Sequence, residues 1–386
     1  MTPASLTWAG VTARRMARHA LTEPATEASP ADIAAVLCGA HAQVLSAAEL
    51  SIGRRIAGGT RWDVQQGLWK DRTLVKTFGP RGTVHLLPTA DLPMWTGAWS
   101  ALPPSVPMHP EPVRFTPSQA EEVIAAIGDA LADAEMTVDE LTEAIVERTG
   151  PWAGERTMEA FQDQWPRWRQ LTSTAAHRGV LCFGANRGRN VTYTNPRRWV
   201  PGFRPEDGRT ALRTLVGRYL HAYGPATPHH FATWLGIPPR RSVQLFQELA
   251  DELEPVETDG EPGWVMVGDT GAPERPHRVI RLLPYFDAFV VAGQPRGRLF
   301  PGPAATRALS PAGQAGNYPV VLVDGVVGGV WHHRRSGRKL AITVEPLGEL
   351  TARQQRQLRD DVELVGSVME AEPALTVGTV SAGPHA

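Results

Sequence analysis

The sequence predicts an α+β protein with three tandem winged helix–turn–helix domains, followed by a small β-barrel with a terminal helix. Two observations predict this class. A unit of amphipathic helices followed by two β-rich runs recurs three times, which indicates a tandem array. The last third of the chain instead alternates strand-like runs with Gly, Pro and Asp. These changes divide the 386 residues into domains 1–112, 113–205, 206–275 and 276–386.

The first unit has the pattern of four helices and a hairpin. Apolar residues at helical spacing predict helices over Val11–Leu21, Ala31–Gly39, Ala47–Gly58 and Asp63–Lys70. Two β-rich runs follow, Thr73–Phe78 and Thr83–Leu87. The Gly-Pro-Arg-Gly segment between them is typical of a turn, so the sequence predicts a hairpin here.

The second and third units repeat this order. In the second, the expected helices are Ser118–Ala134, Val138–Thr149 and Trp165–Gly179, and the strands are Val180–Phe183 and Val191–Thr194. In the third, the helices are Arg209–Ala222, Thr227–Leu235 and Pro239–Leu253, and the strands are Glu254–Thr258 and Trp264–Val267. The alternative is a generic α+β domain in which hairpins follow helices by chance. Three occurrences in the same order disfavour it.

The last third of the chain is predicted to form a small sheet or barrel. Its strand-like runs are Val279–Leu283, Ala288–Val291, Val320–Val323, Val326–Trp331 and Leu340–Val344. Asp324-Gly325 is a strong signal for a two-residue hairpin turn. A helix over Ala352–Met369 follows, and the tail Thr376–Ala386 is expected to be loosely ordered.

Composition excludes several classes of protein. With 39 basic and 40 acidic residues the chain is not globally basic, a balance that does not exclude a basic face with an acidic back. No run approaches a membrane span, and the first residues lack the apolar core of a signal peptide, so a cytoplasmic protein without membrane contact is expected. The two cysteines, Cys38 and Cys182, cannot form a disulfide framework or a thiolate metal site.

Charge is unevenly distributed along the chain. Of the basic residues, three are lysines and 36 are arginines, which a GC-rich genome explains, although arginine also suits phosphate and base edges. Charged residues are all acidic from Glu121 to Glu147, are mostly arginine from Arg156 to Arg218, and are basic again at 334–339. This segregation is compatible with a cationic face, and the acidic helices are then expected to face away from DNA.

The common enzyme signatures are absent, and one short segment remains as a candidate site. The chain has no GxGxxG, P-loop, HExxH, CxxC or GxSxG motif, and its paired histidines do not form a metal-ligand pattern. His41 and Gln43 lie two residues apart between two helices, so in an extended loop both point to one side and together can orient a water. Alternatively, His41 caps or packs against the next helix and Gln43 is merely solvated.

A resemblance favours the catalytic interpretation of this pair. Several segments in order carry it: 41–43 leading into 47–55, 81–86, 178–184, 223–227, 234–236, 282–287, 323–325 and 329–331. With these segments the chain resembles the AlkZ-like (YcaQ-like) winged-helix DNA glycosylases over nearly its whole length. The resemblance implies three tandem winged helices and a C-terminal β-barrel around a DNA-binding channel. It also implies excision of alkylated purines, including bulky adducts and crosslinks at guanine N7, and in some members self-resistance of antibiotic producers.

The resemblance assigns catalysis to His41 and Gln43. The family's usual pair is Gln–apolar–Gln or Gln–apolar–Asp, whereas this chain has His–apolar–Gln, a departure that bears on rate and lesion range. An N7-alkylated purine is already cationic, so its departure needs little acid catalysis. We therefore expect Gln43 to orient water and present its dipole to the sugar, and His41 to act as general base or second water ligand. Because ordinary imidazole has a pKa of about 6.5, activity is expected to fall at acidic pH.

Arginines in the wings are the main candidates for DNA contact. The set comprises Arg81 in the first wing, Arg187 and Arg189 in the second, Arg334, Arg335 and Arg338 in the turn after Val326–Trp331, and Arg14, Arg15 and Arg18 on the first helix. For each of them the alternative is a solvated side chain. Phosphate contacts would make affinity strongly salt-dependent. Aromatic residues at helical spacing, Trp152, Trp165, Trp168 and Trp234, are expected in the core rather than on DNA bases.

The sequence therefore predicts a monofunctional DNA glycosylase without metal or organic cofactor, acting as a monomer on double-stranded DNA with alkylated purines. A Schiff-base step is not expected because the motif has no lysine. The alternative is a non-catalytic winged-helix regulator. Such regulators usually dimerise, and the chain has no obvious dimerisation helix.

Overall fold

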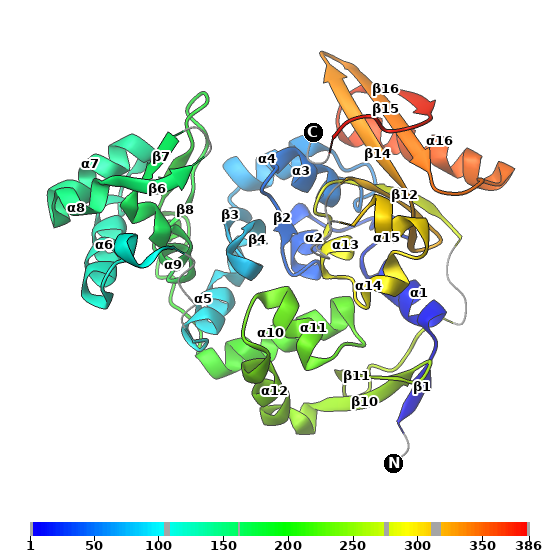
Figure 1. Ribbon diagram of the computed structural model, residues 1–386, viewed down its shortest axis with the longest axis horizontal. Coiled ribbons are helices and arrows are strands. Elements are labelled where there is room, and N and C mark those ends of the chain that lie inside the picture. Colours follow the sequence, from blue (N-terminus) through cyan, green and yellow to red (C-terminus); the bar gives the residue numbers. More distant parts are fainter. Residues whose placement is uncertain (1–2, 104–108, 161–162, 274–277, 310–317, 384–386) are drawn as a thin grey trace. The chain divides into compact units, whose positions relative to one another are not determined.

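The computed structural model describes residues 3–103, 109–160, 163–273, 278–309 and 318–383 (Figure 1). The chain folds into two compact units. The first unit combines Met1–Gly67 with Val216–Ala386, and the second comprises Leu68–Leu215. Residues far apart in sequence therefore build the first unit. No helix among the described residues is long and apolar enough to cross a membrane.

The N-terminal part of the first unit contains the helices that the sequence predicts. Its elements are β1 (Ala4–Leu6), α1 (Trp8–Arg18), α2 (Pro30–Val36), β2 (Ala40–His41), α3 (Leu45–Gly53) and the start of α4 (Arg61–Trp69). The start of α2 shows why helix boundaries could be predicted from the sequence. Ser29 and Asp32 form a capping box there, and Pro30 occupies the first helical position. The short strands β1 and β2 were not predicted.

The middle of the chain adds a helical group and a three-stranded sheet to the same unit. The elements are α10 (Gly208–Tyr223), which begins in the second unit, α11 (Pro228–Leu235), α12 (Pro239–Glu248), β10 (Leu253–Thr258) and β11 (Glu261–Met266). β10 and β11 form the predicted hairpin, which turns through Asp259 and Gly260, both at positive φ. β1 pairs with β10 in parallel, a long-range pairing that no local sequence pattern predicts.

The C-terminal part, predicted to form a small sheet or barrel, is a curled half-barrel of five strands. Its strands are β12 (Ile280–Leu283), β13 (Val320–Val323), β14 (Val326–Ser336), β15 (Lys339–Pro346) and β16 (Glu372–Val377), hydrogen-bonded in this order. The predicted Asp324-Gly325 turn is confirmed, with both residues at positive φ. The predicted terminal helix is confirmed as α16 (Ala352–Val368).

Two predictions in this region are wrong. The tail is not loose throughout, because β16 pairs in parallel with β15 and the amide of Gly378 donates to the carbonyl of Val344. Ala288–Val291 is not a strand but part of α13 (Ala288–Ala292), because the Asp287 carboxylate accepts from the amide of Phe289 and caps the helix. The short helices α14 (Arg296–Leu299) and α15 (Pro303–Arg307) follow.

The half-barrel has a separate core on each face. One face packs against α13 to α15 and residues of α1, including Met16. The other face packs against α16 and against Leu50 of α3. The helix that follows the His41–Gln43 segment is therefore part of the core of the C-terminal sheet.

The second unit contains the remaining elements. They are β3 (Leu74–Phe78), β4 (Val84–Pro88), α5 (Leu92–Ser100), α6 (Pro117–Ala130), β5 (Glu135–Thr137), α7 (Val138–Thr149), α8 (Pro151–Gly154), β6 (Arg156–Ala160), β7 (Asp163–Pro166), α9 (Thr172–His177), β8 (Cys182–Phe183) and β9 (Thr192–Thr194). The predicted helix Trp165–Gly179 is only partly correct. Its first residues belong to the β6–β7 hairpin, a 3₁₀ turn follows at Arg167–Leu171, and only α9 is α-helical.

Acidic and basic segments of the second unit pair with each other. Arg178 binds Glu121 at 2.5 Å, Arg187 binds Glu140 at 2.9 Å, and Arg156 lies 3.8 Å from Asp139. The charge segregation seen along the sequence is therefore partly cancelled in space. These three arginines are therefore less available to DNA than the sequence alone indicates.

Candidate active site

The His41–Gln43 segment begins at the end of the short strand β2 and is fixed on both sides. After α2 the chain turns through Cys38 and Gly39, both at positive φ, and the hydroxyl of Tyr223 donates to the Leu37 carbonyl at 2.7 Å. After Gln43, Val44 is the N-cap of α3 and makes no side-chain capping bond. The capping alternative for His41 is therefore not supported.

The three residues of the segment differ in exposure in the alternating way expected of an extended loop. Ala42 is fully buried, Gln43 is exposed, and His41 is half-buried. Solvent therefore reaches the carboxamide, and the pair is not sealed inside the hydrophobic core.

One face of the His41 ring lies against an aromatic residue from the far end of the sequence. The centroids of the His41 and Phe286 rings are 4.7 Å apart, and the ring planes are inclined by 31°. Phe286 has a φ of 57°, an unusual conformation for a bulky residue. The imidazole is thus packed on one side, as the packing alternative expected, while the adjoining carboxamide stays accessible.

A buried ion pair fixes the residue next to Phe286. The carboxylate of Asp287 accepts two bonds from Arg55, at 2.7 and 2.8 Å, and one from the hydroxyl of Ser51 at 2.7 Å. Its fourth donor is the amide of Phe289, at 3.0 Å. Burial alone would raise the pKa of Asp287, but the attraction of Arg55 and the hydrogen bonds outweigh it and leave that pKa below its ordinary value.

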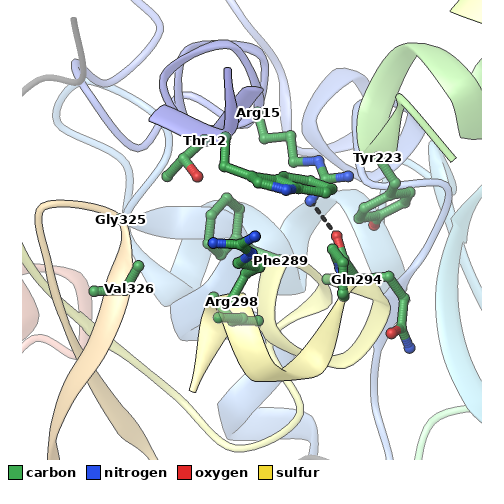
Figure 2. Close-up of a pocket in the computed structure, with 12 residues that line it drawn as sticks. Thr12, Arg15, Tyr223, Phe289, Gln294, Arg298, Gly325 and Val326 are labelled. Atoms are coloured by element: carbon green, nitrogen blue, oxygen red, sulfur yellow. Dashed lines mark hydrogen bonds between the residues drawn. The ribbon is translucent and has the colours of Figure 1, made fainter. Parts of the chain in front are cut away.

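The predicted DNA-contact arginines on α1 are engaged inside the protein. Arg14 is 2% exposed and pairs with Asp269 at 2.7 Å, and Arg18 pairs with the same carboxylate. Arg15 donates to the carbonyls of Gln294, Pro225 and Gly224. Figure 2 shows its side chain directed from α1 into a cavity of ≈ 20 Å³, about the space of one water. We therefore remove Arg14, Arg15 and Arg18 from the candidate DNA interface.

The wing arginines of the second unit are more exposed. Arg81 lies in the 3₁₀ turn between β3 and β4, and Arg187 is about half exposed but bound to Glu140 and to the carbonyl of Glu135. Arg189 is exposed, and no hydrogen bond or ion pair joins its side chain to another described residue. Arg81 and Arg189 stay the better candidates of the three.

The third arginine cluster lies mostly on a strand rather than in a turn. β14 extends to Ser336, so the turn consists of Gly337 and Arg338. Arg335 donates to the Met369 carbonyl on the α16 side, and Arg338 lies 3.5 Å from Glu372. Because neighbouring strand residues point to opposite faces, Arg334 points away from α16. Its exposed side chain has no hydrogen-bond or ion-pair partner among the residues that the structure describes.

Of the four aromatic residues expected in the core, Trp168 and Trp234 are buried, which confirms the prediction for them. Trp152 is half-buried, and Trp165 is 42% exposed and stacks on Arg169. Within the described ranges, no group of three or more His, Cys, Asp or Glu side chains could hold a metal ion.

Comparisons with known proteins identify the family. A family model described as DNA glycosylase AlkZ-like matches residues 34–368, which include the His41–Gln43 segment. The chain is similar to an interstrand DNA cross-link repair glycosylase from Streptomyces sahachiroi, with 34% identity over 341 residues, 84% of this chain and 87% of the relative. The solved structure of Streptomyces sahachiroi DNA glycosylase AlkZ matches with a TM-score of 0.80 and 28% identity, covering 97% of this chain and 100% of that chain.

The chain belongs to the AlkZ-like DNA glycosylase family. It is therefore an enzyme that cleaves N-glycosidic bonds in DNA, and the alternative of a non-catalytic regulator is set aside. The resemblance predicted from the sequence segments is confirmed.

Residues that surround the proposed catalytic pair in this AlkZ-like glycosylase were not predicted individually. They are Ser51, Arg55, Tyr223, Phe286 and Asp287. Two features of the sequence pointed to these residues. Two adjacent arginines follow an apolar helix in the segment 47–55. In addition, Tyr223 and residues 282–287 lie in segments that carry the family resemblance. A charged residue in an apolar helix indicates a buried partner, but the sequence does not say which acid it is.

Proposed function

We propose that this glycosylase excises purines alkylated at N7 from double-stranded DNA by hydrolysis, with His41 and Gln43 as its catalytic residues. The observation that carries the proposal is the exposure of Gln43 beside the half-buried His41, with Ala42 turned into the core. The pair supplies an imidazole and a carboxamide but no carboxylic acid to protonate a leaving base. Such a pair suits a leaving group that is already cationic.

The reaction that we propose balances without a strong acid. The bond between C1′ and N9 breaks, and its electron pair moves onto the alkylated purine and neutralises the base. Positive charge develops on the sugar, which the carboxamide oxygen of Gln43 stabilises while it orients a water. The water oxygen bonds to C1′ and its proton passes to the neutral imidazole of His41, a general-base contribution of roughly 10²–10⁴-fold.

We propose that the chain binds duplex DNA through three winged helices. The order helix, short strand, two helices and two strands occurs at α2 to β4 and at α10 to β11, where an isolated bridge at Ala226 serves as the short strand. The run α6 to β9 has the same order in α6, β5, α7, α9, β8 and β9, with α8 and the β6–β7 hairpin inserted between α7 and α9. This recurring order supports the division of the chain into domains 1–112, 113–205, 206–275 and 276–386. The exposed Arg81, Arg189 and Arg334 are the proposed phosphate contacts.

We propose bulky adducts and crosslinks at N7 as further substrates, with self-resistance of an antibiotic producer as the biological role. The similarity to a relative named as an interstrand cross-link repair glycosylase supports this extension. N7 lies on the major-groove edge of the purine, where a bulky adduct does not disturb base pairing.

The test is strand cleavage by alkali after incubation of the protein with duplex DNA containing one N7-methylguanine. The wild type is expected to leave abasic sites, whereas His41→Ala and Gln43→Ala are expected to bind the same DNA without excising the base. Gln355→Ala removes another exposed glutamine, on α16, and serves as the matched control. Absence of cleavage by the wild type on both simple and bulky N7 adducts would refute the proposed substrate. A flat excision rate from pH 5 to 8 would exclude His41 as the base.

A further inference from the structure

The contact between Phe286 and His41 joins the proposed catalytic segment to the loop between β12 and α13. The two ring centroids are 4.7 Å apart, and the Tyr285 ring lies 5.7 Å from that of Phe286. Phe286 is separated from His41 by 245 positions in the sequence. A contact over such a distance forms only because the two segments belong to the same compact unit.

The backbone of Phe286 is held in a conformation that it would not adopt freely. Its φ of 57° lies in the left-handed region, which is sterically unfavourable for a residue other than glycine. Such a conformation persists only where its surroundings fix it.

The next residue supplies that restraint. Asp287 is 1% exposed, and its two carboxylate oxygens accept four hydrogen bonds. Two of the donors, Ser51 and Arg55, lie one helical turn apart, on α3 and just after its end. The helix that begins after Gln43 therefore also holds the loop that carries Phe286. We call Ser51, Arg55 and Asp287 the clamp.

We propose that Phe286 is a positioning residue for the excision reaction, because its ring covers one face of the His41 imidazole and the clamp keeps that ring in place. The inference rests on the proposed function of His41. Phe286 does not act on the substrate itself. It restricts the orientation of the imidazole, so that one ring nitrogen can share a water with Gln43.

Restricting the ring matters because a general base works only in a narrow geometry. A misplacement of about 1 Å can cost roughly 10²-fold in rate. A half-buried imidazole packed on one face has fewer orientations than one in an open loop.

The test compares Phe286→Gly in two backgrounds. Glycine removes the ring but tolerates the left-handed backbone, so the fold is expected to survive. In the wild-type background, single-turnover excision of N7-methylguanine is expected to fall about tenfold to hundredfold, with DNA affinity unchanged. His41→Gln keeps a hydrogen-bonding side chain without a ring to stack. In that background Phe286→Gly is expected to slow excision by no more than about threefold, because coupled residues are not additive.

A second readout does not depend on activity. The ring signals of His41 in histidine-labelled protein are identified by their absence in His41→Ala, and Phe286→Gly is expected to shift them because the neighbouring ring is lost. Ala20→Gly, also at a positive φ of 49°, is the matched control and should change neither rate nor signals.

Each outcome separates the two proposals. Two outcomes refute the positioning role while the proposed function stands, provided that the wild type excises N7-methylguanine. In one, Phe286→Gly excises the base as fast as the wild type. In the other, Phe286→Gly reduces the excision rate by the same factor in the wild-type and His41→Gln backgrounds. If His41→Gln is itself inactive, the NMR signals decide, and unmoved His41 signals in Phe286→Gly refute the inference. If the wild type does not excise the lesion, the proposed function fails and takes the inference with it.

Discussion

The guanidinium of Arg54 lies 2.9 Å from the carboxylate of Asp361, and 1% of each side chain is exposed. The same carboxylate accepts from the amide of Leu282 at 2.6 Å, so one buried acid joins the end of α3 to β12 and α16. Removing this charge leaves Arg54 buried without its partner. We expect Asp361→Asn to lower the free energy of unfolding by about 3–5 kcal/mol, measured by chemical denaturation.

An exposed pair in the same sheet provides the control. Arg338 and Glu372 are 3.5 Å apart, with 86% and 66% of their side chains exposed. Because water and salt screen such a pair, Glu372→Gln should change stability little. Equal losses in the two variants would contradict the importance assigned to burial.

Buried histidines predict loss of stability in acid. Burial and the nearby Arg55 lower the pKa of His19 from 6.5 to about 3, although its hydrogen bond to the Ala222 carbonyl opposes the shift. The neutral ring is thus favoured in the folded protein. Its contribution is complete above pH 6.5 and is lost as pH falls from 6.5 towards 3. Unfolding free energy should therefore decrease there by up to about 1.4 kcal/mol per pH unit for this group.

Replacing the histidine tests this explanation. His19→Gln removes the titrating ring but keeps a donor for the Ala222 carbonyl. Denaturation curves measured from pH 7 to 4 should show that the free energy of unfolding decreases less steeply with falling pH in the variant than in the wild type. His177 and His230, whose pKa values burial lowers to about 4, still titrate in both proteins. Parallel pH profiles would assign the acid sensitivity to groups other than His19.

Replacing two turn glycines of the half-barrel by alanine is expected to reduce the free energy of unfolding by different amounts. A Cβ on Gly325, at φ 89°, would lie 2.3 Å from Cγ2 of Thr12 and 2.8 Å from the sulfur of Met16 in α1. Gly337, at φ 58°, has no atom within 4 Å of such a Cβ. Gly337→Ala should therefore lose only the backbone term, roughly 1–2 kcal/mol. Gly325→Ala should lose clearly more in thermal or chemical unfolding, and equal losses would argue against close packing of this turn on α1.

Adjacent arginines on β14 predict different effects on DNA binding. Arg334 points away from α16, whereas Arg335 donates to the Met369 carbonyl at 2.7 Å. If Arg334 binds a phosphate, Arg334→Gln weakens duplex binding and reduces the slope of log affinity against log salt by about 0.9. Arg335→Gln should mainly reduce stability. Fluorescence anisotropy across a salt series measures both slopes, and an unchanged slope for Arg334→Gln would remove it from the interface.

Local chemistry explains which elements the sequence predicted. Helices such as α2 and α7 (Val138–Thr149) begin at capping boxes, and the Asp324-Gly325 turn needs two positive φ angles that this pair readily adopts. The failures involve long-range pairing. β1 and β16 are strands only because β10 and β15 offer free edges, and α13 replaces an apolar strand pattern because Asp287 caps it.

In the candidate site, too, the local features were predicted from the sequence and the long-range contacts were not. His41 and Gln43 were noticed as a pair because their spacing is local, and the family resemblance, not the spacing, assigned them to catalysis. Phe286 and the clamp were not, since nothing in the sequence states that Asp287 faces Arg55. The arginines of α1 were assigned to DNA because sequence gives their spacing but not their acceptors, Asp269 and backbone carbonyls.

The ion pair between Arg54 and Asp361 also sets the order of events during synthesis. The two residues are 307 positions apart, so the ribosome needs roughly 15–60 s after making Arg54 before its partner exists. For that interval Arg54 has no Asp361 to bind, whereas Arg55 waits only for Asp287, which lies 232 positions after it. The nascent chain must therefore postpone packing of the helix after the His41–Gln43 segment against the C-terminal sheet until translation is almost finished, and an amino-terminal fragment ending before Asp361 is expected to lack that packing.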